Sequence, residues 1–251
     1  MQTYACQEYG TELTYDEAKA DLDQAMKYLK NDHPLFIHGL TADVQDLYDQ
    51  ALAHLQEKEN ISINDLSREI EMIFSSLGDG HTHVGANYPE YHYLKYIYGH
   101  NLAKDELVAD EFIHYLDVDS YQTWGQDWRL GLLMISSKGS TLTNKKYTDL
   151  LFDGDVYVLI STDSFSSAMD FAMLISDNSL GKIVGEPSGN KPRSYGDISV
   201  FKLKNSGLVM QVSTKKWYRV DESITDELIE PDIACDSEEA LQVLVDYLRG
   251  Q

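Results

Sequence analysis

The sequence predicts an α/β fold that follows a helical region at the N-terminal end. A strand–helix–strand pattern covers 156–186, where apolar runs at 156–160 and 182–186 flank a segment with helical spacing. Three amphipathic helical patterns also fill the first third of the chain. With 43% hydrophobic and 25% charged residues, the composition is typical of a globular protein that can bury a core.

The chain is strongly acidic. It contains 20 basic and 42 acidic residues, which gives a formal net charge of −22. Because phosphate backbones are bound through clustered Lys and Arg, this balance argues against a nucleic-acid partner. The sequence contains no apolar run of about 18 residues, so we expect no membrane span. The N-terminal residues lack a basic start and an apolar centre, so no secretory signal is expected in them.

The first third of the chain predicts three helices. Thr14 and Glu17 form a capping box ahead of the first one. Thr41 is the expected start of the second helix. The third helix is predicted over about 62–77, with Gly78 as its C-terminal cap. A tight turn then leads into a strand.

In the remainder of the chain, the patterns that predict secondary structure are weak in the middle and clear towards the C-terminal end. The middle, about 86–150, is rich in Tyr and His and predicts strands only at 113–118 and 130–136. Alternating apolar residues on both sides of Asn205-Ser206-Gly207 predict a hairpin over 201–213. A final helix is expected after the acidic cap at 236–239.

Three serines lie where the chain passes from the buried strand into the following helix: Ser164, Ser166 and Ser167. Such a turn can expose a nucleophilic hydroxyl, and the first N–H groups of the helix can bind an oxyanion. Serine is also a preferred helix N-cap, so the same residues are explained equally well as structural caps. The pattern alone leaves both interpretations open.

The serines belong to a longer set of motifs. After 164–168 come Val-Gly-Glu-Pro-Ser-Gly-Asn-Lys at 184–191, Tyr-Gly-Asp at 195–197 and Pro-Asp-Ile at 231–233, while Leu-Gly-Asp-Gly-His-Thr stands at 77–82. Together these motifs resemble peptidase family S41, which includes the carboxy-terminal processing (tail-specific) proteases and the tricorn core protease. The resemblance is continuous over about 150–235, and a further match covers about 14–90.

The resemblance implies a fold and a class of substrate. We expect a helical subdomain over 1–85 and a crotonase-like α/β core over 86–251, acting on a peptide or protein. It also implies placement outside the cytoplasm, whereas the oligomeric state is left open. The histidines lack metal-ligand spacing, so no metal is expected, and no cofactor is expected either.

The resemblance also implies catalytic roles. Lys191 follows Ser166 by 25 positions, as the base follows the nucleophile in the tail-specific branch. Lysine is a base only when it is neutral, which requires burial. His81 is the competing base, as in the tricorn-like branch, and imidazole titrates near neutrality without burial. The main-chain N–H groups of Ser167 and Gly139 would then bind the oxyanion.

Two departures from the family pattern lead to a second hypothesis. Only about 65 residues separate Val84 from Leu150, too few for the PDZ domain of most tail-specific members. The strand that usually ends in Asp-Leu-Arg-Asn-x-Gly-Gly is represented by 132–140, where only Gly139 is retained. We therefore expect a serine endopeptidase that acts through an acyl-enzyme on Ser166. The alternative is a degenerate, catalytically silent peptide-binding domain.

Overall fold

The computed structural model divides into two compact units, each assembled from separate stretches of the chain. The residues that it describes are 12–85, 112–130, 133–146, 148–149 and 151–250. Unit 1 comprises Met1–Tyr98, Asp127–Ile135 and Tyr195–Lys216. Unit 2 comprises Gly99–Gln126, Ser136–Ser194 and Trp217–Gln251. The predicted domain boundary between residues 85 and 86 stays a prediction.

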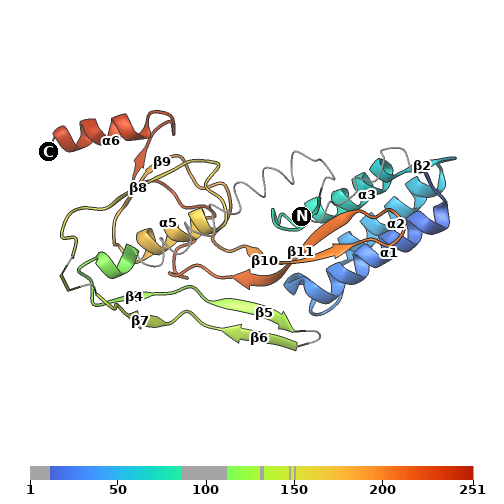
Figure 1. Cartoon of the computed structure of the whole chain (residues 1–251), viewed down its shortest axis with the longest axis horizontal. Coiled ribbons are helices and arrows are strands. Elements are labelled where there is room, and N and C mark those ends of the chain that lie inside the picture. Colours follow the sequence, from blue (N-terminus) through green and yellow to red (C-terminus); the bar gives the residue numbers. More distant parts are fainter. Residues whose placement is uncertain (1–11, 86–111, 131–132, 147, 150, 251) are drawn as a thin grey trace, which may run out of the picture. The chain divides into compact units, whose positions relative to one another are not determined.

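Three helices form the body of unit 1, and all three were predicted (Figure 1). They are α1 (Tyr15–Asp32), α2 (Ala42–Gln56) and α3 (Ile63–Ser75). The side chain of Thr14 caps α1 in the expected capping box, and that of Thr41 caps α2. Between α1 and α2 lies one turn of 3-10 helix, η1 (Pro34–Phe36).

Unit 1 also contains most of an antiparallel hairpin sheet. The strands of this sheet are ordered β10-β11-β5-β6, and β3 pairs with β11 as well. Their bounds are β3 (His83–Gly85), β5 (Gln126–Leu130), β6 (Leu133–Ser137), β10 (Tyr195–Lys202) and β11 (Val209–Trp217). A separate pair joins β1 (Glu12–Leu13) to β2 (Ile61–Ser62). The predicted hairpin is confirmed, with longer arms than expected.

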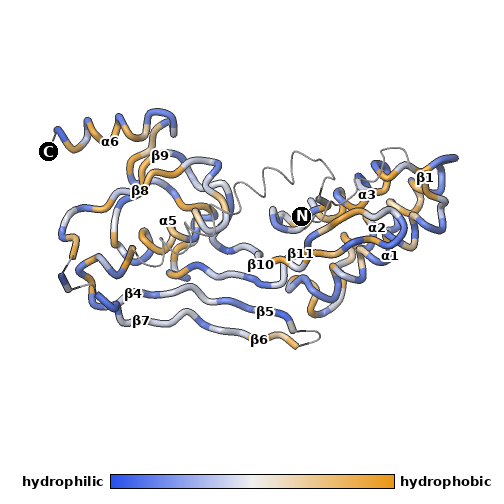
Figure 2. The backbone as a smooth tube through the Cα atoms, in the orientation of Figure 1, coloured by the Kyte–Doolittle hydropathy of each residue, from blue (hydrophilic) through white to orange (hydrophobic). Residues whose placement is uncertain are grey.

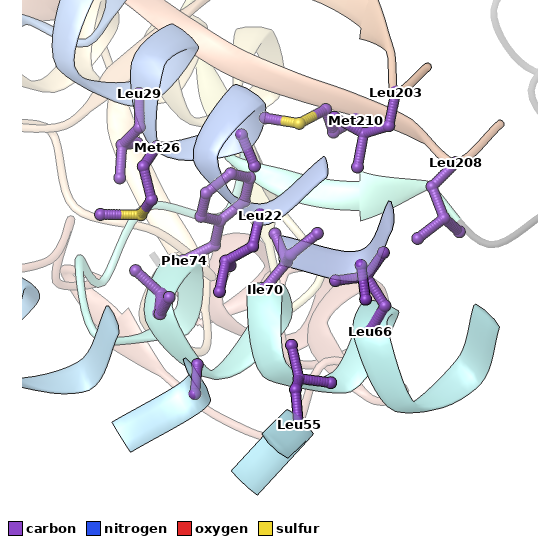
Figure 3. Close-up of a cluster of buried hydrophobic side chains, with 14 of the residues drawn as sticks. Leu22, Met26, Leu29, Leu55, Leu66, Ile70, Phe74, Leu203, Leu208 and Met210 are labelled. Atoms are coloured by element: carbon purple, nitrogen blue, oxygen red, sulfur yellow. The ribbon is translucent and has the colours of Figure 1, made fainter. Parts of the chain in front are cut away.

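The core of unit 1 fills the space between the helices and the hairpin (Figure 3). Leu22 of α1 and Phe74 of α3 are fully buried there, as is Met210 of β11. The apolar spacing that predicted the helices therefore also identifies the faces that they bury.

The middle of the chain differs from its prediction. The strand expected at 113–118 is wrong, because its first residues form the 3-10 helix η2 (Ile113–Tyr115). The buried side chain of Asn144 explains the difference, since its Nδ2 donates to the carbonyl oxygens of Ile113 and Leu116 and stabilises a turn. The single strand expected at 130–136 is instead shared between the end of β5 and most of β6.

Unit 2 contains the predicted strand–helix–strand pattern. Strand β8 (Tyr157–Ile160) leads through a turn into α5 (Ser167–Asp177), and β9 (Lys182–Gly185) returns parallel to β8. Strand β12 (Ile233–Ala234) adds to the other edge of β9, and α6 (Ala240–Arg249) follows it. This arrangement confirms the α/β class. Two short strands, β4 (Ser120–Gln122) and β7 (Thr141–Thr143), pair separately.

The parallel sheet of unit 2 lies between two helices. Successive residues of β9 face opposite sides of the sheet. Ile183 packs with Met169 of α5, whereas Val184 packs with Leu244 of α6. Figure 2 shows the hydrophobic segments of β8 and β9 and the alternating character of α6, as expected for a helix that buries one face. Among the residues described, no helix has the length and apolarity needed to cross a membrane.

Candidate active site

Ser166 lies between the turn that follows β8 and the first residue of α5. It stands at the N-cap of α5, yet its side chain makes no capping hydrogen bond. Its backbone has φ 57° and ψ −126°, a conformation that glycine dominates and that costs about 1–3 kcal/mol for other residues. A strained strand-to-helix turn of this kind presents the nucleophile in many hydrolases. The capping interpretation therefore does not hold for Ser166.

Neighbouring contacts hold the turn before Ser166 in place. The Ser164 hydroxyl accepts a hydrogen bond from the main-chain N–H of Ser161 at 3.0 Å, which gives Ser164 a structural role. The Ser164 carbonyl in turn accepts from the N–H of Gly189 at 2.9 Å. A Cβ at Gly189 would collide with the carbonyl oxygen of Thr162, so only glycine fits there.

The first turn of α5 contains Ser167, the residue that the sequence predicts as an oxyanion donor. Ser167 is the first helical residue, and the ladder begins with the Asp170 N–H donating to the Ser166 carbonyl at 2.9 Å. The N–H groups ahead of this bond point out of the helix N-terminus, which favours negative charge. This local geometry agrees with the role expected for Ser167.

Lys191 lies in unit 2 with Ser166, but its side chain is directed to a different partner. Its Nζ is 2.8 Å from Oε2 of Glu227, and 55% of its side chain is exposed. The hydrogen bond from Lys191 lowers the pKa of Glu227, so this carboxylate stays charged. A general base must be neutral and desolvated. The exposed side chain of Lys191 is not desolvated in this way.

His81 belongs to unit 1, where it follows a buried carboxylate. The main-chain N–H of His81 donates to Oδ1 of Asp79 at 3.0 Å, and Nδ1 of its ring is 3.7 Å from the same oxygen. The carbonyl of His81 accepts from Nε2 of Gln211 at 2.8 Å, which fixes the backbone against β11. A negative charge beside Nδ1 favours the tautomer that carries its proton there, and Nε2 is then the acceptor.

A second histidine binds the other oxygen of Asp79. The ring of His33 is completely buried, and its Nδ1 accepts from the N–H of Leu35 at 3.2 Å. The proton of this ring is therefore on Nε2, which donates to Oδ2 of Asp79 at 3.2 Å. The hydroxyl of Thr82 donates to the same Oδ2 at 2.6 Å. Asp79 is thus surrounded by donors on both of its oxygens.

These donors determine the charge of Asp79. Burial alone would raise the pKa of this carboxyl, but hydrogen bonds from His33 and His81 outweigh burial and hold the pKa far below its ordinary range. Asp79 is consequently a buried carboxylate at neutral pH. The same charge, together with burial as the larger cause, raises the pKa of Tyr195, whose ring lies 4.5 Å from that of His33.

Gly139, the other predicted oxyanion donor, lies beside Thr123 in unit 2. A Cβ at Gly139 would collide with the carbonyl oxygen of Thr123. The adjacent residue, Gln122, donates its N–H to Oδ1 of Asn178, which follows the C-terminal end of α5. These contacts connect the Gly139 segment with the end of α5 opposite to Ser166. Its role in an oxyanion hole stays a prediction.

Sequence reasoning missed three polar residues around these groups: Asp79, His33 and Asn190. The Oδ1 atom of Asn190 accepts from the main-chain N–H of Ser166 at 3.0 Å. Asp79 could have been found from its position two residues before His81. His33 and Asn190 gave no signal, because tertiary contacts alone bring them to their partners. In the described part of the chain, no three His, Cys, Asp or Glu side chains gather as metal ligands.

The comparisons with known proteins identify the family. The model of peptidase family S41 matches residues 72–235 of the chain. This protein belongs to peptidase family S41. The S41 match begins within α3 and ends before α6, so it includes every site residue predicted from the sequence: His81, Gly139, Ser166, Ser167 and Lys191. The predicted family is therefore confirmed.

Two solved structures share the fold of this S41 member. A candidate peptidase from Parabacteroides merdae has a TM-score of 0.66 at 15% identity, with 92% of this chain and 96% of that chain covered. A lipoprotein from Streptococcus agalactiae has a TM-score of 0.55 at 9% identity, with 100% and 99% covered. At these identities the likeness concerns the fold alone. The comparison with curated proteins gave no match.

Proposed function

We propose that this S41 family member is a serine peptidase that cleaves peptide bonds through an acyl-enzyme on Ser166, in a core of the crotonase-like kind. The observation that carries the proposal is the backbone of Ser166, whose φ of 57° and ψ of −126° are strained and whose side chain does not cap α5. Backbone strain of this size persists where the fold has a use for it, most often at a functional site.

The proposed chemistry begins with proton transfer from the Ser166 hydroxyl to a general base, Lys191 or His81. Oγ of Ser166 then attacks the carbonyl carbon of the peptide, and the Ser167 N–H binds the resulting oxyanion. The C–N bond breaks as the same base returns the proton to the leaving amine. A water molecule attacks the acyl-enzyme in the same way, which releases the acid and restores the Ser166 hydroxyl.

The surroundings of the two candidate bases favour His81 over Lys191. The buried carboxylate of Asp79 lies 3.7 Å from Nδ1 of His81, the side of the ring from which a base is oriented. Lys191 is exposed and paired with Glu227, so it lacks the desolvation that would make it neutral. By its local surroundings, His81 is therefore better suited to act as a base than Lys191, and both stay candidates for that role.

Labelling with a fluorophosphonate probe tests this proposal, because the probe reacts only with an activated serine. We expect the wild type to be labelled, Ser166→Ala to lose the label, and His81→Ala to react at least about 100-fold more slowly. Lys191→Ala should stay within about 3-fold of the wild type, since exposed ion pairs contribute little. Ser223→Ala, in an exposed loop of unit 2, is the matched serine control. Full labelling of Ser166→Ala would refute the proposal.

A catalytically silent peptide-binding domain is the second candidate. One observation favours it. The segment next to Gly139 contacts Asn178 at the C-terminal end of α5, whereas Ser166 lies at the N-terminal end. The loss of one oxyanion donor costs about 2.7–4 kcal/mol of transition-state stabilisation. This candidate predicts a wild type that binds peptides in a peptide-array screen but takes up no fluorophosphonate while a control serine protease does.

A further inference from the structure

The conformation of Ser166 differs from that of the other serine and threonine N-caps described for this chain. Thr14, Thr41 and Ser62 all have extended backbones with ψ 159°, and the side chain of each accepts a hydrogen bond from its helix. That geometry is the usual one for a cap. Ser166 has the same residue type at the same position but a positive φ and no capping bond. Some contact must therefore hold it out of the capping conformation.

Asn190 provides that contact. Its Oδ1 accepts from the main-chain N–H of Ser166 at 3.0 Å, across 24 residues of sequence. This bond fixes, from outside the helix, the orientation of the peptide group whose N–H belongs to Ser166.

Asn190 is itself held by buried partners. The hydroxyl of Ser188 donates to the carbonyl of Asn190 at 2.9 Å and accepts from the N–H of Ile229 at 3.0 Å. Only 2% of Ser188 is exposed, so this connection is shielded from water. Gly189 binds the Ser164 carbonyl from the same loop. The loop is thus held at Ser188, at Gly189 and at the carbonyl of Asn190, which limits the movement of the Asn190 amide away from Ser166.

We propose that Asn190 is the positioning residue of the nucleophile: its side-chain oxygen keeps Ser166 in the strained conformation and prevents the hydroxyl from capping α5. The inference rests on the proposed function, in which Ser166 is the nucleophile. In this inference, the loop that carries Lys191 acts on the nucleophile through the amide oxygen of Asn190 and not through the ammonium group of Lys191. Without Asn190, the hydroxyl would satisfy the first N–H groups of α5, where it would be a poor nucleophile.

The rate of fluorophosphonate labelling measures this role. We expect Asn190→Ala to be labelled about 10- to 100-fold more slowly than the wild type, because small displacements of reacting groups have effects of this size. Asn190→Asp retains an acceptor oxygen and should recover most of the rate. Asn178→Ala is the matched control, since Asn178 binds main-chain groups at the other end of α5. It should label within about 2-fold of the wild type, although it loses comparable hydrogen bonds.

A second readout does not depend on reactivity. Hydrogen exchange of the Ser166 amide, observed by NMR with ¹⁵N-serine, should be protected in the wild type and in Asn178→Ala but fast in Asn190→Ala. Equal labelling of Asn190→Ala and Asn178→Ala, or no recovery in Asn190→Asp, would overturn the positioning role while leaving the proposed function in place. A wild type that takes up no label refutes the proposed function and, with it, this role. Rapid exchange of the wild-type amide contradicts the hydrogen bond itself.

Discussion

At the scale of single residues, the site depends on groups kept in unfavourable states by their neighbours. Ser166 has a positive φ, which glycine adopts far more readily than other residues. Asp79 is a buried carboxylate surrounded by hydrogen-bond donors. Both states cost free energy that the surrounding hydrogen bonds must offset. A substitution that relieves the backbone strain should therefore stabilise the fold. A substitution that removes the compensating hydrogen bonds should destabilise it.

The strain at Ser166 predicts an unusual order of stabilities. Ser166→Gly should be more stable than Ser166→Ala by about 1 kcal/mol in urea unfolding, because glycine adopts positive φ without strain. The matched pair at Ser223, a position without positive φ, should show the reverse order. If Ser166→Ala is as stable as Ser166→Gly, the backbone is not strained.

The charge of Asp79 predicts a dependence of stability on pH. Its pKa is lower in the folded state than in the unfolded chain, so it stabilises the fold above pH 4 and loses that contribution progressively as the pH falls. Asp79→Asn should cost about 2–4 kcal/mol at pH 7, since the amide places a donor against those of His33 and Thr82. The difference from the wild type should narrow between pH 4 and pH 2. A difference that is constant over this range, measured by urea unfolding, would contradict the assigned charge.

At the scale of elements, one buried side chain joins the β10–β11 hairpin to α1. Asp21 accepts from the main-chain N–H groups of Asn205 and Ser206 at 2.9 and 2.6 Å, and from the hydroxyl of Ser206 at 2.6 Å. The carboxylate therefore substitutes for partners that the turn residues lack within the hairpin. The register of β10 and β11 is fixed at this turn, close to the first helix.

Removing this carboxylate should loosen the whole of unit 1. We expect Asp21→Ala to lower the free energy of unfolding by about 2–4 kcal/mol, because several buried donors lose their acceptor together. Asp23→Ala on the same helix removes an exposed ion pair with Lys19 and an exposed hydrogen bond from the Tyr48 hydroxyl, so it should cost only about 1 kcal/mol. Equal losses in the two variants, compared by chemical denaturation, would show that the Asp21 contacts are unimportant.

At the scale of the whole molecule, the sequence predicts those parts whose signals are local. The three N-terminal helices follow from caps and apolar spacing, and the β8–α5–β9 pattern follows from two apolar runs around a helical segment. Strands β4 and β7 could not be predicted, since each is only three residues long and nearly all of their residues are exposed. The error at 113–118 has a different origin, because Asn144, whose side chain stabilises the turn, is distant in sequence.

The site shows the same division between local and distant signals. The place of Ser166 was predictable because a strand and a helix flank it in sequence. The environment of Lys191 was not, because its partner Glu227 lies 36 residues further along the chain. The role given to Asn190 depends likewise on a contact across 24 residues. Spacing within a motif therefore identifies candidate groups, whereas their protonation and orientation depend on tertiary partners.

The central claim is that Ser166 forms an acyl-enzyme, and trapping that intermediate tests it most directly. The protein is mixed with p-nitrophenyl acetate as a generic acyl donor, quenched in acid and digested for mass spectrometry. We predict a single acetyl group on Ser166 that forms in the wild type and in Lys191→Ala but not in His81→Ala. An acetyl group on another residue, or none on Ser166 while a control serine hydrolase is acetylated, would contradict the account.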